Sequence, residues 1–92
     1  NGLMFAIVEK DDLAAQVYRY VVYAPAVARK AKAGQFVILR IDEDGERIPI
    51  TIADWDPLKG TITIFVQAVG KTTIQLSTMH AGDSLADVVG PL

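Results

Sequence analysis

Cysteine is absent from this chain of 92 residues, and histidine occurs only once, as His80. Without cysteine there is no disulfide, no thiolate nucleophile and no ligand of the usual iron–sulfur kind. A single histidine also excludes nearly all zinc and copper sites, so we expect no metal centre. Any chemistry therefore has to come from other side chains, from the backbone or from a bound cofactor.

Long apolar runs and a concentration of basic charge are also missing. No apolar segment approaches the roughly 20 residues that cross a bilayer, and the first ten residues do not have the pattern of a signal peptide. The formal net charge is −2, and the only basic cluster is Arg29, Lys30 and Lys32, which is typical of a solvated loop. We therefore expect a cytoplasmic protein with neither a membrane nor a nucleic acid as partner.

The composition that remains is that of one folded domain. Hydrophobic residues make up 51% of the chain and charged residues 22%, which suits a packed core rather than a disordered segment. There is no internal repeat and no low-complexity segment. We expect residues 1–92 to form a single domain.

Short apolar or alternating stretches, separated by turn residues, follow one another along nearly the whole chain. Six of them are predicted to be strands: Leu3–Val8, Gln16–Tyr23, Gln35–Ile41, Arg47–Trp55, Thr61–Gln67 and Asp83–Val89. Asp11 and Asp12 are expected to interrupt the first strand. Asp44-Gly45 is a strong hairpin signal between two of the others. The pattern predicts an all-β fold, a six-stranded antiparallel Greek-key barrel with one or two short helices.

The period of the pattern changes after the sequence Gly-Lys-Thr-Thr (residues 70–73), and a two-turn helix is predicted from Thr72 or Thr73 to Met79 with a threonine as its N-cap. This run resembles the end of a nucleotide-binding P-loop, but the glycine required five positions earlier is Phe65. Backbone N–H groups at a helix start can still bind an anion. The alternative is structural: Gly70 ends a strand and a threonine caps a helix.

The second candidate stretch is Glu46–Thr51, with the sequence Glu-Arg-Ile-Pro-Ile-Thr. Pro49 gives up a ladder hydrogen bond, so it belongs at a strand edge or a bulge. Arg47 and Thr51 share its face, and together they could bind a polar ring with an anionic tail. The structural alternative is an edge strand with a surface arginine.

Four segments together resemble a known family. They are Ala33–Ile41, Gly45–Asp54, Val66–Thr73 and Ala81–Leu92, and they occur in the family's order over nearly the whole chain. The chain is similar to the N-terminal flavin-binding barrel of the ferredoxin–NADP reductase superfamily. Within it, the resemblance is to electron-transfer subunits related to sulfide dehydrogenase, NADH-dependent ferredoxin:NADP oxidoreductase and dihydroorotate dehydrogenase.

The resemblance implies FAD as cofactor and assigns roles to individual positions. The family's Arg-x-Tyr-Ser/Thr strand places its arginine near the FAD pyrophosphate, its aromatic residue on the isoalloxazine and its hydroxyl near flavin N5. Here Pro49, Ile50 and Thr51 occupy the last three positions, while Arg47 lies one residue early and therefore on the opposite face of the strand. The family's Gly-x-x-Ser/Thr motif is met by Gly70–Thr73. The implied cofactor-binding residues are Arg47, Pro49, Ile50, Thr51, Val66, Val69, Gly70, Lys71, Thr72 and Thr73.

The resemblance also implies a function and partners. In the family, an NAD(P)H-binding second lobe follows the barrel, a hydride passes to the flavin, and electrons continue singly to an iron–sulfur partner. We therefore expect an oxidoreductase whose FAD-binding module is this chain, which alone is not competent and has no catalytic side chain of its own. Two alternatives remain open: a ligand-free barrel that serves as an interaction or assembly domain through Trp55 and its neighbours, and phosphate transfer at Gly-Lys-Thr-Thr.

Overall fold

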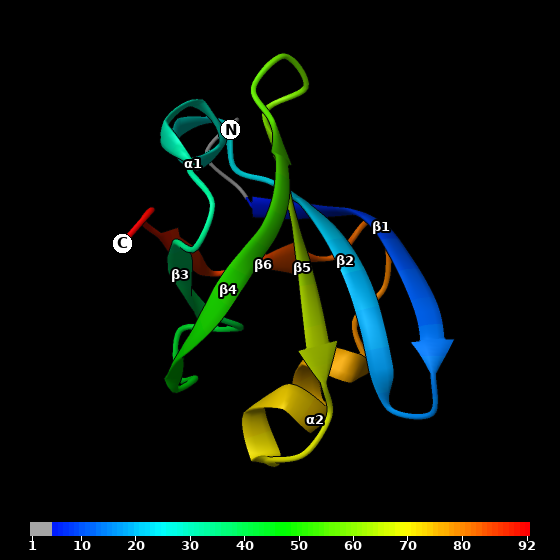
Figure 1. Ribbon diagram of the computed structural model, residues 1–92. Helices are drawn as coiled ribbons and strands as arrows, with labels where there is room; N and C mark the ends of the chain where they lie inside the picture. The colour runs from blue at the N-terminus through cyan, green and yellow to red at the C-terminus, as the bar shows by residue number, and fades with distance from the viewer. Residues whose placement is uncertain (1–4) are drawn as a thin grey trace.

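A computed structural model describes residues 5–92 of the chain, so Leu3 and Met4 of the first predicted strand lie outside it. All strand pairs are antiparallel, and the strand order is β6-β1-β2-β5-β4-β3-β7. The elements are β1 (Phe5–Ala14), β2 (Val17–Tyr23), α1 (Pro25–Lys30), β3 (Phe36–Arg40), β4 (Arg47–Asp56), β5 (Thr61–Gln67), α2 (Lys71–Ser77), β6 (Ser84–Leu85) and β7 (Asp87–Val89). Figure 1 shows the sheet curled into a nearly closed barrel, with α1 at one end and α2 at the other. The prediction of an all-β antiparallel barrel with two short helices is thus confirmed.

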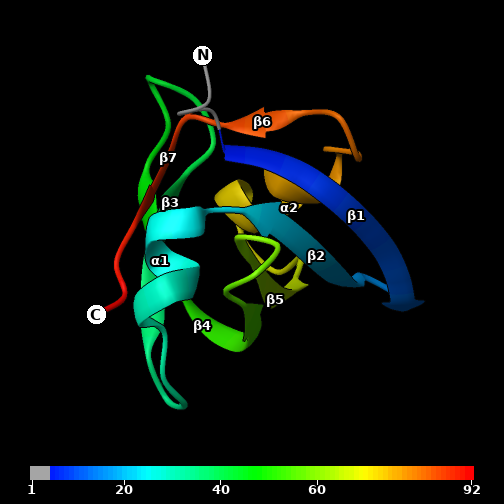
Figure 2. The same ribbon diagram turned by 90° about the horizontal axis from the view of Figure 1, so that it is seen from above.

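The strand count differs from the prediction: residues 5–92 form seven strands instead of six. The predicted last strand, Asp83–Val89, divides at Ala86, whose N–H donates to the Arg40 carbonyl at 2.9 Å. Its first part is β6, which pairs with β1, and its second part is β7, which pairs with β3. Figure 2 shows β6 beside the start of β1 and β7 beside β3. The division lets one segment complete both edges of the sheet, which closes the barrel.

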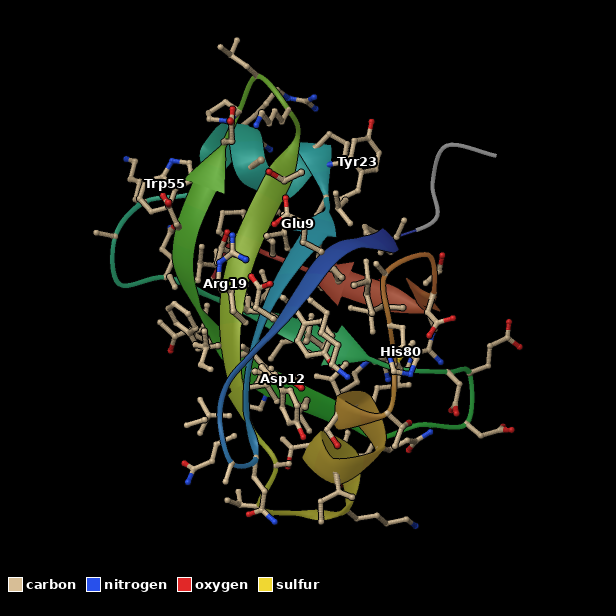
Figure 3. All side chains as sticks on the ribbon, turned by 90° about the vertical axis from the view of Figure 1, so that its right-hand side faces the viewer. Glu9, Asp12, Arg19, Tyr23, Trp55 and His80 are labelled. Atoms are coloured by element: carbon tan, nitrogen blue, oxygen red, sulfur yellow. The ribbon has the colours of Figure 1, made fainter. Side chains whose placement is uncertain are left out.

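Strand β1 is longer than predicted, because Asp11 and Asp12 continue it rather than interrupt it. Asp11 lies opposite Arg19 on β2 and forms an ion pair with it, and Glu9 lies 3.5 Å from the same guanidinium. Figure 3 shows Glu9 and Arg19 side by side. Asp11 is neutralised across the strands and Asp12 is exposed to solvent, so neither opposes strand formation.

The core contains the side chains that point inward from the strands. Ile62, Ile64 and Val66, predicted to share one face of a strand, are buried together, and so are Tyr20 and Val22 of the neighbouring strand. Alternation between buried and exposed positions places the remaining side chains of β5 on the outer surface. Neither helix within residues 5–92 has the length and apolar character needed to span a bilayer.

Tyr20 joins the barrel wall to α2. Its hydroxyl donates to the carbonyl of Leu76 at 2.7 Å, and the side chain is completely buried. Burial, followed by the nearby Tyr18, Asp12 and Asp83, raises the pKa of Tyr20 to about 12. The neutral phenol is therefore the form that the folded chain favours.

Removal of the Tyr20 hydroxyl should reduce the fall in the free energy of unfolding at alkaline pH. Because the folded-state pKa lies above the ordinary value of 10.0, the contribution is fully present below pH 10 and is lost as the pH rises through about 12. At about 1.4 kcal/mol per pKa unit, this loss is about 2–3 kcal/mol. Urea unfolding from pH 8 to 12 should show a smaller decline for Tyr20→Phe than for the unchanged chain. Parallel declines would contradict the assignment.

Candidate functional site

Helix α2 begins at Lys71, within the first candidate stretch, Gly-Lys-Thr-Thr, and its cap differs from the prediction. The N-cap residue is Gly70, not a threonine, so no side chain accepts hydrogen bonds from the amides of the first turn. Thr73 acts instead from the third helical position. Its Oγ1 accepts from the N–H groups of Val69 at 3.0 Å and Gly70 at 2.9 Å. The predicted threonine cap is wrong because the hydroxyl folds back onto the loop.

Gly70 is a glycine that the fold itself does not require. Its backbone has φ −134° and ψ 174°, an extended conformation open to any residue. A Cβ added there would meet no heavy atom within 4 Å. Serine, aspartate or asparagine would cap the helix slightly better than glycine does, by roughly a few tenths of a kcal/mol. A bare backbone at this position leaves room for a ligand to approach the amides closely.

Thr72 points inward rather than toward a ligand. It is buried, and its hydroxyl donates to the Glu46 carboxylate at 2.6 Å. This bond ties α2 to the loop between β3 and β4. A hollow of about 320 Å³ lies beside it, lined by Lys71, Thr72 and Gln75 of α2 and by Asp42, Asp44, Gly45 and Glu46 of the loop. Three carboxylates make this hollow unfavourable for phosphate, which directs any anion to the Gly70 side of the helix start.

Strand β4 changes partners along its length. Residues 47–51 pair with β3, whereas pairing with β5 begins only at Ile52. Figure 1 shows the two strands diverging toward the end of the barrel where α2 lies. The Ile52 N–H donates to the Gln35 carbonyl at 2.9 Å, on the β3 side. Since backbone groups alternate along a strand, the N–H groups of Arg47 and Thr51 point to the side where β5 diverges.

The two faces of this half of β4 carry different predicted residues. Arg47, Pro49 and Thr51 are exposed on the outer face. Ile50 is half-buried and packs against the core together with Ile48. The one-residue offset inferred from the sequence is therefore present, and Arg47 does not share a face with Ile50.

The structure brings most of the predicted residues to one end of the barrel. The Glu46–Thr72 hydrogen bond places the start of β4 next to α2. Val69 and Lys71 are exposed beside Gly70. Val66 is the exception, because the residue is 1% exposed and its side chain belongs to the core. That fraction covers the whole residue, so its backbone is not open to a ligand either.

Two exposed aromatic residues were not among the sequence-predicted site residues. Phe36 lies directly opposite Thr51 on β3, and its exposed fraction is 37%. Phe65 lies on the outer face of β5 with 51% exposure. Large aromatic side chains on a barrel exterior suit contact with a planar ligand or another protein surface. Period-two alternation placed Phe65 on the outer face, but no signal in the sequence marked either ring as part of a site.

A second hollow, of about 310 Å³, lies on the outer surface where β1, β2, β5 and β4 adjoin, and it includes Glu9, Arg19 and Asp54. Arg19 is already neutralised by Glu9 and Asp11, so the hollow offers no free guanidinium. Trp55 also borders it, but that ring is half-buried and packs against the core. Trp55 therefore offers little exposed surface for the partner that an assembly domain would bind.

Two further features of the sequence have structural explanations. Asp56 Oδ1 accepts from the N–H groups of Leu58 and Lys59 at 3.0 and 3.1 Å, which makes it a turn residue. The sheet around Gly-Lys-Thr-Thr is antiparallel, as predicted, and a P-loop requires a parallel one. Phosphate transfer at this motif therefore has no structural support.

No protein-family model matches the chain. Among curated proteins, it is 53% identical over 89 residues to an uncharacterised protein of Clostridium beijerinckii, covering 97% of this chain and 30% of that protein. A dihydroorotate dehydrogenase B electron-transfer subunit homologue of Thermotoga maritima is 46% identical over 86 residues, covering 94% of this chain and 30% of the homologue. The corresponding electron-transfer subunit of Shouchella clausii is 35% identical, covering 94% and 34%. The chain thus spans about a third of the length of the curated relatives it matches.

Two solved structures also match the chain over nearly its whole length. The structure of an NADH-dependent reduced ferredoxin–NADP oxidoreductase, described for flavin-based electron bifurcation, superposes with a TM-score of 0.94 at 45% identity. The match covers 97% of this chain and 32% of that one. A cytochrome P450 reductase of Amycolatopsis shares the fold, with a TM-score of 0.74 at 22% identity over 97% of this chain and 27% of the reductase.

Proposed function

Because the chain belongs to the N-terminal barrel family of the ferredoxin–NADP reductase superfamily, we propose that it is the FAD-binding module of an NAD(P)H-dependent flavoprotein reductase. The observation that carries the proposal is its close structural and sequence match to a ferredoxin–NADP oxidoreductase. The nicotinamide nucleotide would be bound by a second lobe, and an iron–sulfur protein or subunit would be the electron partner. The whole protein would be an oxidoreductase of the cytoplasm.

The residues at the end of the barrel near α2 fit a flavin dinucleotide. Gly70 leaves open space beside the N–H groups of the first turn of α2, which no side chain caps. Lys71 adds an exposed cation. These features suit the FAD diphosphate, and each charge-assisted hydrogen bond to it is worth about 1.5–3 kcal/mol. A diphosphate contact is the reason to propose FAD rather than a flavin with one phosphate.

The ring end of the cofactor would lie along the first half of β4. The Thr51 N–H points to the side where β5 diverges, and the Thr51 hydroxyl lies on the exposed outer face. Pro49 fixes the backbone there, and Ile50 contributes an apolar surface without aromatic stacking. The Thr73 hydroxyl holds the loop that carries Val69 and Gly70. Arg47 would reach the diphosphate only around the edge of the strand, Thr72 would contribute through its backbone N–H, and Val66 would support the site only from the core.

FAD, when bound, supplies the chemistry that converts two-electron transfer from a nicotinamide into one-electron transfer to an iron–sulfur centre. The chain itself binds, orients and shields the ring, and donates hydrogen bonds that set its reactivity.

Flavin binding by the purified chain tests the proposal directly. Titration of FAD should quench flavin fluorescence and shift its visible absorption bands as the ring leaves water. FMN and riboflavin, titrated in parallel, should bind more weakly because they lack the diphosphate. A chain that leaves both the fluorescence and the absorption of all three flavins unchanged would falsify the proposal.

Replacement of Thr51 should reveal the contact to the ring. Thr51→Val keeps the shape and removes the hydroxyl, so FAD affinity should fall about two- to tenfold, which corresponds to one hydrogen bond of about 0.5–1.5 kcal/mol. The absorption spectrum of bound FAD should also change. Thr61→Val, at a half-buried position of β5 in the opposite half of the barrel, is the matched control and should leave both unchanged. Equal effects from the two variants would exclude a specific role for Thr51.

A further inference from the structure

The carbonyl end of α2 is held by side chains of the β1–β2 hairpin. The Lys10 ammonium donates to the Ser77 carbonyl at 2.6 Å, and the Tyr20 hydroxyl donates to the Leu76 carbonyl at 2.7 Å. Lys10 and Tyr20 lie directly opposite each other in the strand register. Ser77 is the last residue of the helix, so a cation there also meets the negative end of the helix dipole.

Two aromatic rings surround the same ammonium. Lys10 Nζ lies 4.9 Å from the centroid of the Tyr18 ring and 5.7 Å from that of Tyr20. The side chain is half-buried, and no carboxylate in residues 5–92 lies within 4.0 Å of the ammonium. The Ser77 carbonyl and the two ring faces favour one position of the ammonium. The ammonium is therefore fixed on α2 rather than free in solvent.

This anchoring matters because α2 is short. Its seven residues span about 10 Å at 1.5 Å per residue, so the direction of the helix fixes where both of its ends lie. At the other end, the Thr73 hydroxyl binds the N–H groups of Val69 and Gly70 and makes them continuous with the helix. A shift of the carbonyl end would therefore move the Val69–Thr73 segment with it.

We infer that Lys10 is a positioning residue for cofactor binding: it holds the carbonyl end of α2 and thereby fixes the Val69–Thr73 segment against the cofactor's diphosphate. The inference rests on the proposed function. Lys10 contacts the carbonyl end of α2, whereas the diphosphate would lie at the other end. Lys10 belongs to β1 and would not contact the cofactor itself. Lys10 should affect only the binding of the diphosphate. The ring would lie along β4, away from the end of α2 that Lys10 holds.

Parallel titrations of FAD and riboflavin test this role, since riboflavin has the ring but no phosphate. Lys10→Met should weaken FAD binding by about tenfold, the loss of roughly one charge-assisted contact, and leave riboflavin affinity unchanged. Lys10→Arg should restore FAD affinity, because a guanidinium can still reach the carbonyl. Lys30→Met, at an exposed position at the end of α1, is the matched control and should bind both flavins normally.

The outcomes separate this inference from the proposed function. If the unchanged chain binds neither flavin, both fail. If it binds FAD and Lys10→Met binds FAD equally well, only the role of Lys10 is excluded. Equal losses of FAD and riboflavin would also exclude it, since they would show that Lys10 supports the barrel as a whole. Should Lys10→Met not fold, Lys10→Gln, which keeps a donor, should show a smaller selective loss of FAD.

Discussion

A Gly70→Val chain is expected to fold, to lose less than about 1 kcal/mol of stability and to bind FAD about a hundredfold more weakly. The loss corresponds to about 2.7 kcal/mol, or one to two charge-assisted hydrogen bonds from backbone amides that the diphosphate could no longer approach. Most of the stability should be retained because the extended backbone accepts valine and the position faces open space, so only the poorer N-cap preference of valine lowers it. Fluorescence titration and urea unfolding of the same preparation measure the two effects.

This combination distinguishes a ligand contact from a structural glycine. Ala26→Val, at an exposed position of α1 at the other end of the barrel, adds similar bulk and should alter neither quantity appreciably. If Gly70→Val binds FAD normally, the amides after Val69 do not contact the diphosphate. If it loses much more stability than the changed N-cap explains, the open space around Gly70 is needed by the fold.

The largest effect on stability is expected at Leu76. Its side chain is 1% exposed and fills the core from α2, so Leu76→Ala removes buried surface and leaves a cavity. Such truncations cost about 2–5 kcal/mol, a large part of the 5–15 kcal/mol that typically stabilises a domain. The urea midpoint should fall accordingly, with little change in slope.

Ile74→Ala on the same helix is the matched control. Ile74 is 52% exposed, so the same kind of truncation should change the free energy of unfolding by less than about 1 kcal/mol. A loss for Leu76→Ala as small as that for Ile74→Ala would mean that α2 is held mainly by its polar contacts at both ends. In that case the packing of Leu76 would not be the main anchor.

Elements with regular alternation were predictable from the sequence. The bounds of β5 and the inward face of Ile62, Ile64 and Val66 follow from strict period-two alternation of apolar and polar residues. The barrel follows from many such stretches with short turns between them. The offset of Arg47 from Ile50 was also readable, because a strand side chain changes face at every residue.

Features that depend on distant partners were not predictable. Thr72 is buried because its hydroxyl finds Glu46, which is 26 residues away in sequence, and no local pattern marks that pair. The charges of Asp11 and Asp12 suggested a break, but Arg19 on the next strand compensates the first of them. The break at Ala86 likewise reflects pairing with two distant strands. In each case tertiary contacts override the local preference.

The change of partners along β4 has a consequence for the chain when it carries no cofactor. A strand side without a neighbour can template the addition of another chain, which is a first step toward insoluble aggregates. On this side of β4, Pro49 has no N–H to offer, so an incoming strand would lose a hydrogen bond in the middle of the unpaired segment. The proline thus makes the surface that a ligand would cover a poor starting point for self-association.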